Sequence, residues 1–218
     1  MKEENQGKRY DLIAAEFAKM RDSFYLEQKY LDLFMSYLQP NAHVLDIGCG
    51  SGYPIAAYLI EKGFQVTGVD GSQELLNIAK IKCPKLHTVY GYIRTVTLNN
   101  KYDGLLEWWC LFHIPKQDHA KMISRFATWI KPGGFLEFTT GDEDYEDTSS
   151  DMLNQELSFY SLTPQLYEKY LKENGFKILL REHDQEHHLV WIAQHKSDNA
   201  PASWWLHGLL TAPRAVII

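Results

Sequence analysis

Residues 44–59, with the sequence VLDIGCGSGYPIAAYL, constrain the chain more than any other segment. An apolar run enters three closely spaced glycines and leaves them as a helix-like pattern. A strand that passes through glycines into a helix places backbone N–H groups and the positive end of the helix beside the turn, and glycine lets a ligand approach the backbone closely. We therefore expect this turn to bind a ligand.

The next strand indicates that this ligand contains a nucleoside. It ends at Asp70, 20 residues after Gly50, where a carboxylate can accept hydrogen bonds from both ribose hydroxyls. The dinucleotide fingerprint G-x-G-x-x-G is not met, because Tyr53 stands where its third glycine would fall. Asp46, just before the turn, would repel a pyrophosphate but can pair with an amino group. S-adenosylmethionine, a positively charged amino acid joined to a nucleoside, fits this pattern.

Strand and helix patterns alternate along most of the chain. The segments HVLDI, FQVTGVD, LHTVYGY, YDGLLEWW and FLEFTT predict strands, while ELLNIAK and HAKMISRFATWI predict helices. A further helix, TPQLYEKYLKENGF, precedes two strands whose short link requires antiparallel pairing. We expect one α/β domain with a single seven-stranded, mostly parallel sheet, in which the strand at residues 187–195 is antiparallel.

Composition limits the other possibilities. With 218 residues, 45% of them hydrophobic, the chain is long enough for one globular domain, which we assign to residues 1–195. Residues 196–218, including Trp204 and Trp205, form a tail of unknown role that we expect the fold not to need. A charged N-terminus and the lack of an apolar run of about 18 residues predict a cytoplasmic protein that does not enter membranes. The formal charge of −6 argues against a nucleic-acid partner.

The cysteines and histidines do not predict a metal site. The three cysteines are widely spaced and form no C-x-x-C pair. His183, His187 and His188 cluster near the end of the chain, but adjacent residues of a strand point to opposite faces and do not bind one ion together. The acidic stretch at residues 141–151, with six carboxylates, is expected to be a solvated loop.

Four segments together resemble the class I S-adenosylmethionine-dependent methyltransferases: VLDIGCGSG, VTGVDGS, YDGLLEWWCLFHI and KPGGFLEFTT. The resemblance covers about residues 10–194 and implies a Rossmann-like, doubly wound sheet, methyl transfer, and S-adenosyl-L-methionine as cofactor. Many members carry an acid where Tyr92 stands, so we expect stacking or a backbone contact at the adenine instead. The cofactor contacts that we expect are Asp46, Gly48, Gly50, Asp70, Gly71, Ser72, Tyr92, Ile93 and Trp108.

The segment after the fourth strand is expected to supply the acceptor pocket, lined by Trp108, Trp109, Phe112 and His113. His113 is the candidate catalytic residue, because it is the titratable side chain there that can accept a proton near neutral pH. As a base it predicts an activity rise near pH 6–7, and as an orienting group it predicts none. The resemblance further implies an N-terminal helical lid over the cofactor, with Tyr10 and Arg21.

The acceptor itself is less constrained. The chain has neither a separate target-recognition domain nor a basic character, so a small-molecule acceptor is expected, and the acidic stretch with the nearby aromatic residues favours an amine-bearing one. Two alternatives stay open. One is an NAD(P)-dependent oxidoreductase on a related fold, and the other is a non-catalytic module that binds S-adenosylmethionine. The oligomeric state is open as well.

Overall fold

The computed structural model describes residues 6–24 and 26–200. The expected C-terminal tail, with Trp204 and Trp205, lies almost wholly outside the described residues, so its role stays a prediction. No helix within the described ranges is both long enough and apolar enough to cross a bilayer.

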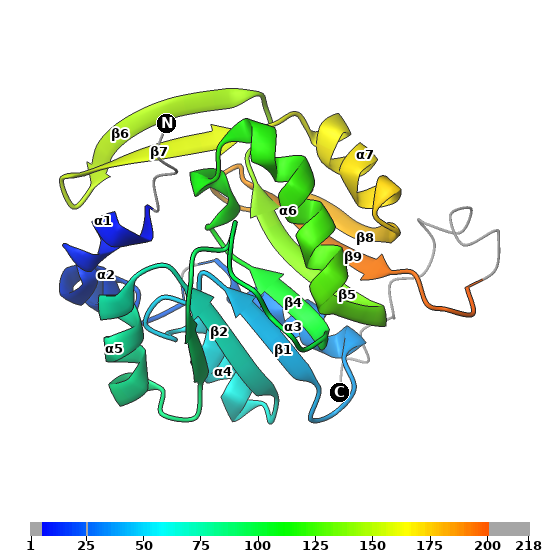
Figure 1. Cartoon of the computed structure of the whole chain (residues 1–218), viewed down its shortest axis with the longest axis horizontal. Coiled ribbons are helices and arrows are strands. Elements are labelled where there is room, and N and C mark those ends of the chain that lie inside the picture. The colour runs from blue at the N-terminus through cyan, green and yellow to red at the C-terminus, as the bar shows by residue number, and fades with distance from the viewer. Residues whose placement is uncertain (1–5, 25, 201–218) are drawn as a thin grey trace.

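A seven-stranded sheet forms the centre of the molecule, in the order β3-β2-β1-β4-β5-β9-β8 (Figure 1). Neighbouring strands from β3 to β5 pair in parallel, whereas β9 pairs antiparallel with both β5 and β8. The expected mostly parallel sheet with one antiparallel strand is therefore confirmed. The strands are β1 (His43–Ile47), β2 (Gln65–Asp70), β3 (His87–Tyr90), β4 (Tyr102–Glu107), β5 (Ile130–Thr140), β8 (Phe176–His183) and β9 (Leu189–His195).

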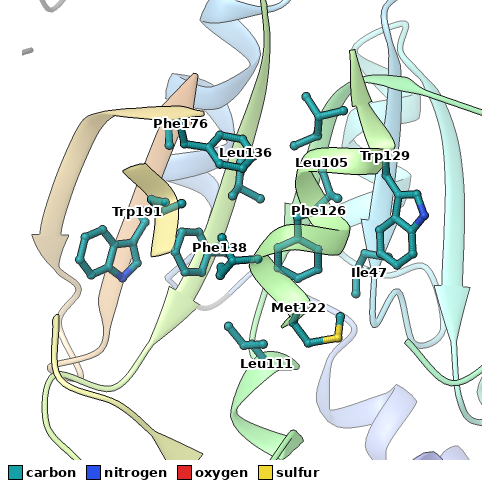
Figure 2. Close-up of a cluster of buried hydrophobic side chains, with 14 of the residues drawn as sticks. Ile47, Leu105, Leu111, Met122, Phe126, Trp129, Leu136, Phe138, Phe176 and Trp191 are labelled. Atoms are coloured by element: carbon teal, nitrogen blue, oxygen red, sulfur yellow. The ribbon is translucent and has the colours of Figure 1, made fainter. Parts of the chain in front are cut away.

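Helices cover both faces of this sheet (Figure 1). Helices α3, α4 and α5 pack on one face, where Val44 and Leu106 belong to the same apolar cluster as Phe34. Helices α6 and α7 pack on the other face, and Figure 2 shows Met122 and Phe126 of α6 within that cluster. The helices are α1 (Gly7–Asp11), α2 (Ala14–Met20), α3 (Gln28–Tyr37), α4 (Ile55–Glu61), α5 (Gln73–Lys82), the short 3-10 helix η1 (Leu111–His113), α6 (Lys116–Trp129) and α7 (Pro164–Glu173).

A second, two-stranded sheet corrects two expectations. Strands β6 (Tyr145–Met152) and β7 (Gln155–Ser161) form a hairpin that arches over the sheet (Figure 1), so the acidic stretch is not a loop and the sheet is not the only one. Most of β6 is exposed, and its sequence lacks the apolar alternation by which strands are recognised. The turn residues Leu153 and Asn154 both have positive φ, as a two-residue hairpin turn requires.

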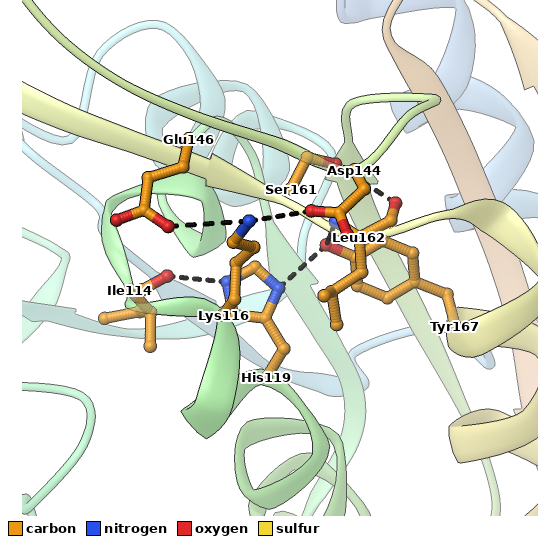
Figure 3. A network of polar contacts seen from close by, with 8 residues as sticks. All are labelled: Ile114, Lys116, His119, Asp144, Glu146, Ser161, Leu162 and Tyr167. Carbon is orange, nitrogen blue, oxygen red and sulfur yellow. Dashed lines mark hydrogen bonds and ion pairs between the residues drawn. The ribbon is translucent and has the colours of Figure 1, made fainter.

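A buried polar network fixes the base of this hairpin (Figure 3). The His119 ring lies between the Ile114 carbonyl, 2.6 Å from Nε2, and the Tyr167 hydroxyl, 2.8 Å from Nδ1. A carbonyl only accepts, so Nε2–H donates to it and Nδ1 accepts from Tyr167. The Tyr167 oxygen in turn accepts from the backbone N–H of Leu162, just after β7. Burial lowers the pKa of His119 to about 4, so the ring is neutral at physiological pH.

We predict that His119→Leu lowers the free energy of unfolding by about 2–4 kcal/mol, because it leaves the Ile114 carbonyl and the Tyr167 hydroxyl without their partner in the core. Urea unfolding followed by circular dichroism measures this. The control is His87→Leu at an exposed position on β3, which should change stability by no more than about 0.5 kcal/mol. Equal losses in the two variants would contradict a stabilising network.

Candidate functional site

A cavity opens where β1, β2 and β4 end at the same edge of the sheet. Its space, about 130 Å³, is roughly ten times what one water molecule needs, so it suits a ligand rather than a packing defect. The glycine turn forms its floor and the N-terminal helices border it from above. The lining residues are Gln6, Gly7, Tyr10, Phe17, Arg21, Asp46, Gly48, Cys49, Gly50, Ser51, Tyr53, Ile55, Asp70, Gly71, Leu75, Tyr92, Ile93, Trp108, Trp109, Cys110, His113 and Ile114.

The glycines of the turn are required by conformation and by space. Gly48 and Gly50 have φ values of +76° and +53°, in the left-handed region that disfavours other residues. A Cβ on Gly48 would lie 2.7 Å from the Cβ of Cys110, which leaves no room for a side chain. Among the residues that the structure describes, a Cβ on Gly50 would come within 4 Å of Phe17 alone, at 4.0 Å across the cavity. The backbone at Gly50 is therefore open to a ligand.

The Asp70 carboxylate joins two turns at the floor of the cavity. Its Oδ2 accepts from the backbone N–H of Gly50 at 2.8 Å, and its Oδ1 accepts from that of Ser72 at 2.7 Å. Burial raises its pKa to about 6, against the lowering effect of these hydrogen bonds. Each oxygen keeps a further lone pair, so the side chain can also accept hydrogen bonds from a ligand.

Asp46 presents a second buried carboxyl to the same cavity. Within the described part of the chain it has no hydrogen-bond or ion-pair partner, and only 3% of its surface is exposed. Burial, and then the neighbouring Asp70 and Glu107, raise its pKa to about 7. A cationic group of a ligand would favour the charged form of this unpartnered carboxyl, so the cavity suits a positively charged ligand here.

The N-terminal segment lies beside α5 (Figure 1) and contributes residues to the lining of the cavity. Gly7 approaches Gly71 so closely that a Cβ on it would be 2.3 Å from the Gly71 carbonyl carbon. Asp11 accepts from the Ser72 hydroxyl at 2.6 Å and from the backbone N–H of Glu74 at 3.0 Å. The segment is thus attached to the first turn of α5, the turn that follows Asp70.

The lip, residues 107–114 after β4, is held by a buried carboxylate. Glu107 accepts from the backbone N–H groups of Cys110, Leu111 and Thr139, the second of these at 2.7 Å. The intervening Trp109 has a φ of +57°, which is rare for a bulky residue, and its N–H donates to Thr139 Oγ1 at 2.8 Å. Glu107 therefore stabilises a strained turn that projects Trp108 and Trp109 into the cavity.

His113 sits at the end of the lip between two partners. Its Nδ1 lies 2.9 Å from the Ser158 carbonyl of β7, and its Nε2 lies 2.9 Å from the Tyr10 hydroxyl of α1. The carbonyl fixes the proton on Nδ1, so Nε2 accepts from Tyr10. Burial lowers the pKa of His113 to about 4 and raises the pKa of Tyr10. The activity rise near pH 6–7 was expected only of a base at His113, and burial keeps this ring neutral throughout that range, as the orienting role requires.

The cavity brings together most of the residues expected from the sequence. Eight of the nine expected cofactor residues line it, and so does His113. Ser72 does not, because it is fully buried as the N-cap of α5, where its hydroxyl accepts from the Leu75 N–H at 3.1 Å. Phe112 is not a lining residue either, since its ring packs on Phe159 of β7.

Sequence reasoning named Tyr10, Trp109 and His113 but missed the contacts that they make. These contacts depend on segments far apart in the chain. Tyr10 donates its hydroxyl hydrogen to His113, and β7 contacts the other side of the His113 ring. The positive φ of Trp109 was not predictable from its neighbours either. The signals that could have found these contacts are weak: Tyr10 in the N-terminal segment and Glu107 just before the paired tryptophans. The ring of His188, in the turn before β9, lies 5.7 Å from that of Trp109. Among residues 6–24 and 26–200 there is no cluster of three metal-ligating side chains.

Comparisons with known proteins agree with this geometry. The chain matches the family described as "Methyltransferase domain" over residues 17–188, and it belongs to that family. The ubiquinone biosynthesis O-methyltransferase of Coxiella burnetii is 35% identical over 109 residues, covering 48% of this chain and 45% of that protein. That of Hydrogenovibrio crunogenus is 29% identical over 139 residues, covering 61% and 56%. The chain thus spans about half the length of the curated relatives it matches.

Solved structures share the fold. The 1,6-didemethyltoxoflavin-N1-methyltransferase of Burkholderia thailandensis, solved with 1,6-didemethyltoxoflavin and S-adenosylhomocysteine, superposes with a TM-score of 0.68. The superposition covers 88% of each chain at 19% sequence identity. At this identity the likeness concerns the fold, so the chemistry has to be argued from the side chains of the cavity.

We predict that Glu107→Gln lowers the free energy of unfolding by about 2–3 kcal/mol, because the amide places N–H groups against backbone donors. The matched control is Glu137→Gln, on the neighbouring strand β5. Glu137 is equally buried, has no hydrogen-bond partner within the described residues, and burial raises its pKa well above the usual range. Its amide variant should be neutral or slightly stabilising. If thermal unfolding ranks the two variants the other way round, Glu107 does not hold the lip.

Proposed function

We propose that this protein transfers the methyl group of S-adenosyl-L-methionine to a small-molecule acceptor. The observation that carries the proposal is the single cavity that joins an accessible glycine turn, two buried carboxyls and a Tyr10–His113 pair. Membership of the methyltransferase domain family supports it. The net charge of −6 and the three unpaired cysteines favour an acceptor other than nucleic acid and a reducing, cytoplasmic setting.

The residues of the cavity fit this cofactor. Asp46 and the Gly48–Gly50 turn would hold its cationic amino-acid part, and Asp70 would accept from its ribose hydroxyls. Tyr92 and Ile93 would flank its adenine, and Trp108 would cover the side that faces the acceptor. S-adenosylmethionine, when bound, supplies an electrophilic methyl group on a sulfonium centre, so alignment and exclusion of water are the main tasks left to the protein.

The Tyr10–His113 pair is the part of the cavity that can receive a proton. Tyr10 Oη donates to His113 Nε2 and keeps a lone pair for the hydroxyl of an acceptor. As the acceptor loses its proton to Tyr10 Oη, the tyrosine proton moves to Nε2, while Nδ1–H stays on the Ser158 carbonyl. The low pKa of His113 makes it a weak resting base, so the pair mainly orients the nucleophile. The O-methyltransferase names of the matched relatives favour a hydroxyl acceptor.

The two alternatives make different predictions. An NAD(P)-dependent oxidoreductase would have to place a pyrophosphate near the unpartnered Asp46 carboxyl, which electrostatics disfavours. A non-catalytic module would bind the cofactor and transfer nothing. A screen of phenol, carboxylate, thiol and amine acceptors for S-adenosylhomocysteine release separates these cases. Release with at least one phenol or carboxylate supports the proposal, and tight cofactor binding with no turnover favours the module.

We predict that affinity for S-adenosylmethionine increases as the pH rises from 5 to 8. The cationic groups of S-adenosylmethionine favour the charged form of Asp46. In the free protein the pKa of Asp46 is about 7, so below that pH Asp46 must release a proton when the cofactor binds. Below pH 7 the dissociation constant should rise by up to about tenfold for each unit by which the pH falls. Calorimetry in buffers of different ionisation enthalpy detects the released proton. Asp46→Asn should weaken binding and flatten the profile, and an unchanged profile in this variant would exclude Asp46 as the partner.

We predict that Tyr10→Phe and His113→Gln each lower the methyl-transfer rate by about 10²-fold, because each removes one end of the hydrogen bond that orients the acceptor. The double variant should be little slower than either single one, since the two residues act as a unit. The loss should be the same at pH 6 and pH 8, where His113 is neutral. Additive losses, or a loss that depends on pH in this range, would contradict the paired role. The dissociation constant for S-adenosylhomocysteine serves as the control and should change little.

A further inference from the structure

The loop at residues 91–96, between β3 and β4, is bonded to α6 by Arg125. This side chain donates from Nε to the Ile93 carbonyl at 3.2 Å and from Nη2 to the Val96 carbonyl. Its guanidinium carbon also lies 4.7 Å from the centre of the Trp129 ring, one turn further along α6, in cation–π contact. Arg125 therefore fixes two backbone carbonyls of the loop against the helix.

Backbone hydrogen bonds close the same loop on itself. The Tyr92 carbonyl accepts from the backbone N–H groups of Thr95 and Val96, at 2.9 and 2.8 Å. The N–H of Gly91 donates to the Asp70 carbonyl at 3.0 Å, and a Cβ on Gly91 would lie 2.7 Å from Val96 Cγ2. The loop is thus held against the end of β2, where Asp70 lines the cavity.

The backbone N–H of Ile93 is a buried donor without an acceptor. Ile93 is 3% exposed and lines the cavity, and in the part of the chain that the structure describes its N–H forms no hydrogen bond. In a trans peptide the N–H points opposite to the carbonyl, and the Tyr92 carbonyl of this peptide faces the interior of the loop. The Ile93 N–H therefore points out of the loop, and a buried donor of this kind requires an acceptor from elsewhere.

The sheet order relates this donor to the base of a bound nucleoside. Asp70, the expected ribose contact, ends β2, and the loop follows β3, which is the next strand outward and the edge of the sheet. A base directed outward from Asp70 would turn the edge that is remote from the ribose toward Ile93. In adenine that edge carries the ring nitrogen N1, which accepts a hydrogen bond, next to the amino group. The loop sequence GYIRTV offers that amino group no carboxylate, so the loop backbone has the larger role.

We propose that Arg125 is a positioning residue for recognition of the base. By holding the Ile93 and Val96 carbonyls, it keeps the Ile93 N–H directed at N1 of the adenine. This inference rests on the proposed methyl transfer, because it takes S-adenosylmethionine as the ligand. Arg125 itself touches no ligand, since it does not line the cavity, and it acts through the backbone of the loop.

The test uses S-adenosylhomocysteine and two analogues of it, in which a C–H group replaces either N1 or N3 of the adenine. Calorimetry at pH 8, where all three bases are uncharged, gives the dissociation constants. The wild-type protein should bind the N1 analogue at least about tenfold more weakly than S-adenosylhomocysteine, and the N3 analogue nearly as tightly. Arg125→Met keeps an aliphatic side chain beside Trp129 but removes the donors, so it should reduce the N1 penalty to less than about threefold.

Two control variants separate this role from general support of the fold. Arg181→Met removes an arginine that lies 5.7 Å from the Trp191 ring, outside the cavity. Asp118→Asn weakens the other link between the loop and α6, the ion pair with Arg94, which joins side chains and not the Ile93 carbonyl. Both variants should keep the N1 penalty even where their thermal unfolding temperature falls. Arg125→Gln, too short to reach both carbonyls, is a second test variant in case Arg125→Met does not fold, and it should also reduce the penalty.

Failure of this inference differs from failure of the proposed function. If the wild-type protein does not bind S-adenosylhomocysteine at all, the proposed methyl transfer itself is overturned. If it binds, the positioning role is overturned by an N1 analogue that binds as tightly as S-adenosylhomocysteine, or by a penalty that follows N3 instead. It is equally overturned if the N1 penalty is unchanged in the folded Arg125 variants, or if Asp118→Asn reduces it as much as they do.

Discussion

The hydrogen bonds that Asp70 accepts from Gly50 and Ser72 hold together the part of the molecule on which everything else depends. One oxygen fixes the glycine turn after β1, and the other fixes the start of α5 after β2. Ser72 then donates to Asp11, so the N-terminal segment is attached to the same point. The glycine turn, the start of α5 and the N-terminal segment share no helix or strand, and this one carboxylate links them. Each backbone N–H that it binds would otherwise be an unpaired donor at a turn or a helix end.

Carboxyl groups supply structure throughout the site. Glu107 holds the lip, Asp11 docks the N-terminal segment, and Glu27 orients Arg21. Asp46 differs, because it faces the cavity without a partner in the described ranges. Burial raises the pKa of both Asp46 and Glu107 to about 7, but the hydrogen bonds of Glu107 oppose this shift, whereas neighbouring carboxyls add to it at Asp46. Glu107 therefore maintains the fold, whereas Asp46 remains available to a positively charged ligand.

The sheet could be predicted from the sequence because its determinants are local. Apolar runs, glycine turns and helix caps such as Ser72 each lie within a few neighbouring residues, and their order along the chain determines the topology. The β6–β7 hairpin could not be predicted, because β6 is polar on both faces and depends on backbone pairing. The pairing of Tyr10 with His113 spans 103 residues, and the burial that lowers the pKa of His113 arises only after β7 covers the ring. The lining of the cavity around the glycine turn was thus largely predictable, and the surroundings of Tyr10 and His113 were not.

The β6–β7 hairpin can change in sequence and length without any change in the central sheet. It leaves the central sheet after β5 and rejoins the main body at α7, so its length and side chains can vary without shifting the register of any of the seven strands. Through Ser158 it contacts both Gln6 and His113. Mutations in a segment that no core strand depends on would therefore reshape the surroundings of His113 while the glycine turn stayed intact. If the proposed methyl transfer holds, such an arrangement would allow acceptor preference to diverge within a lineage at little risk to folding.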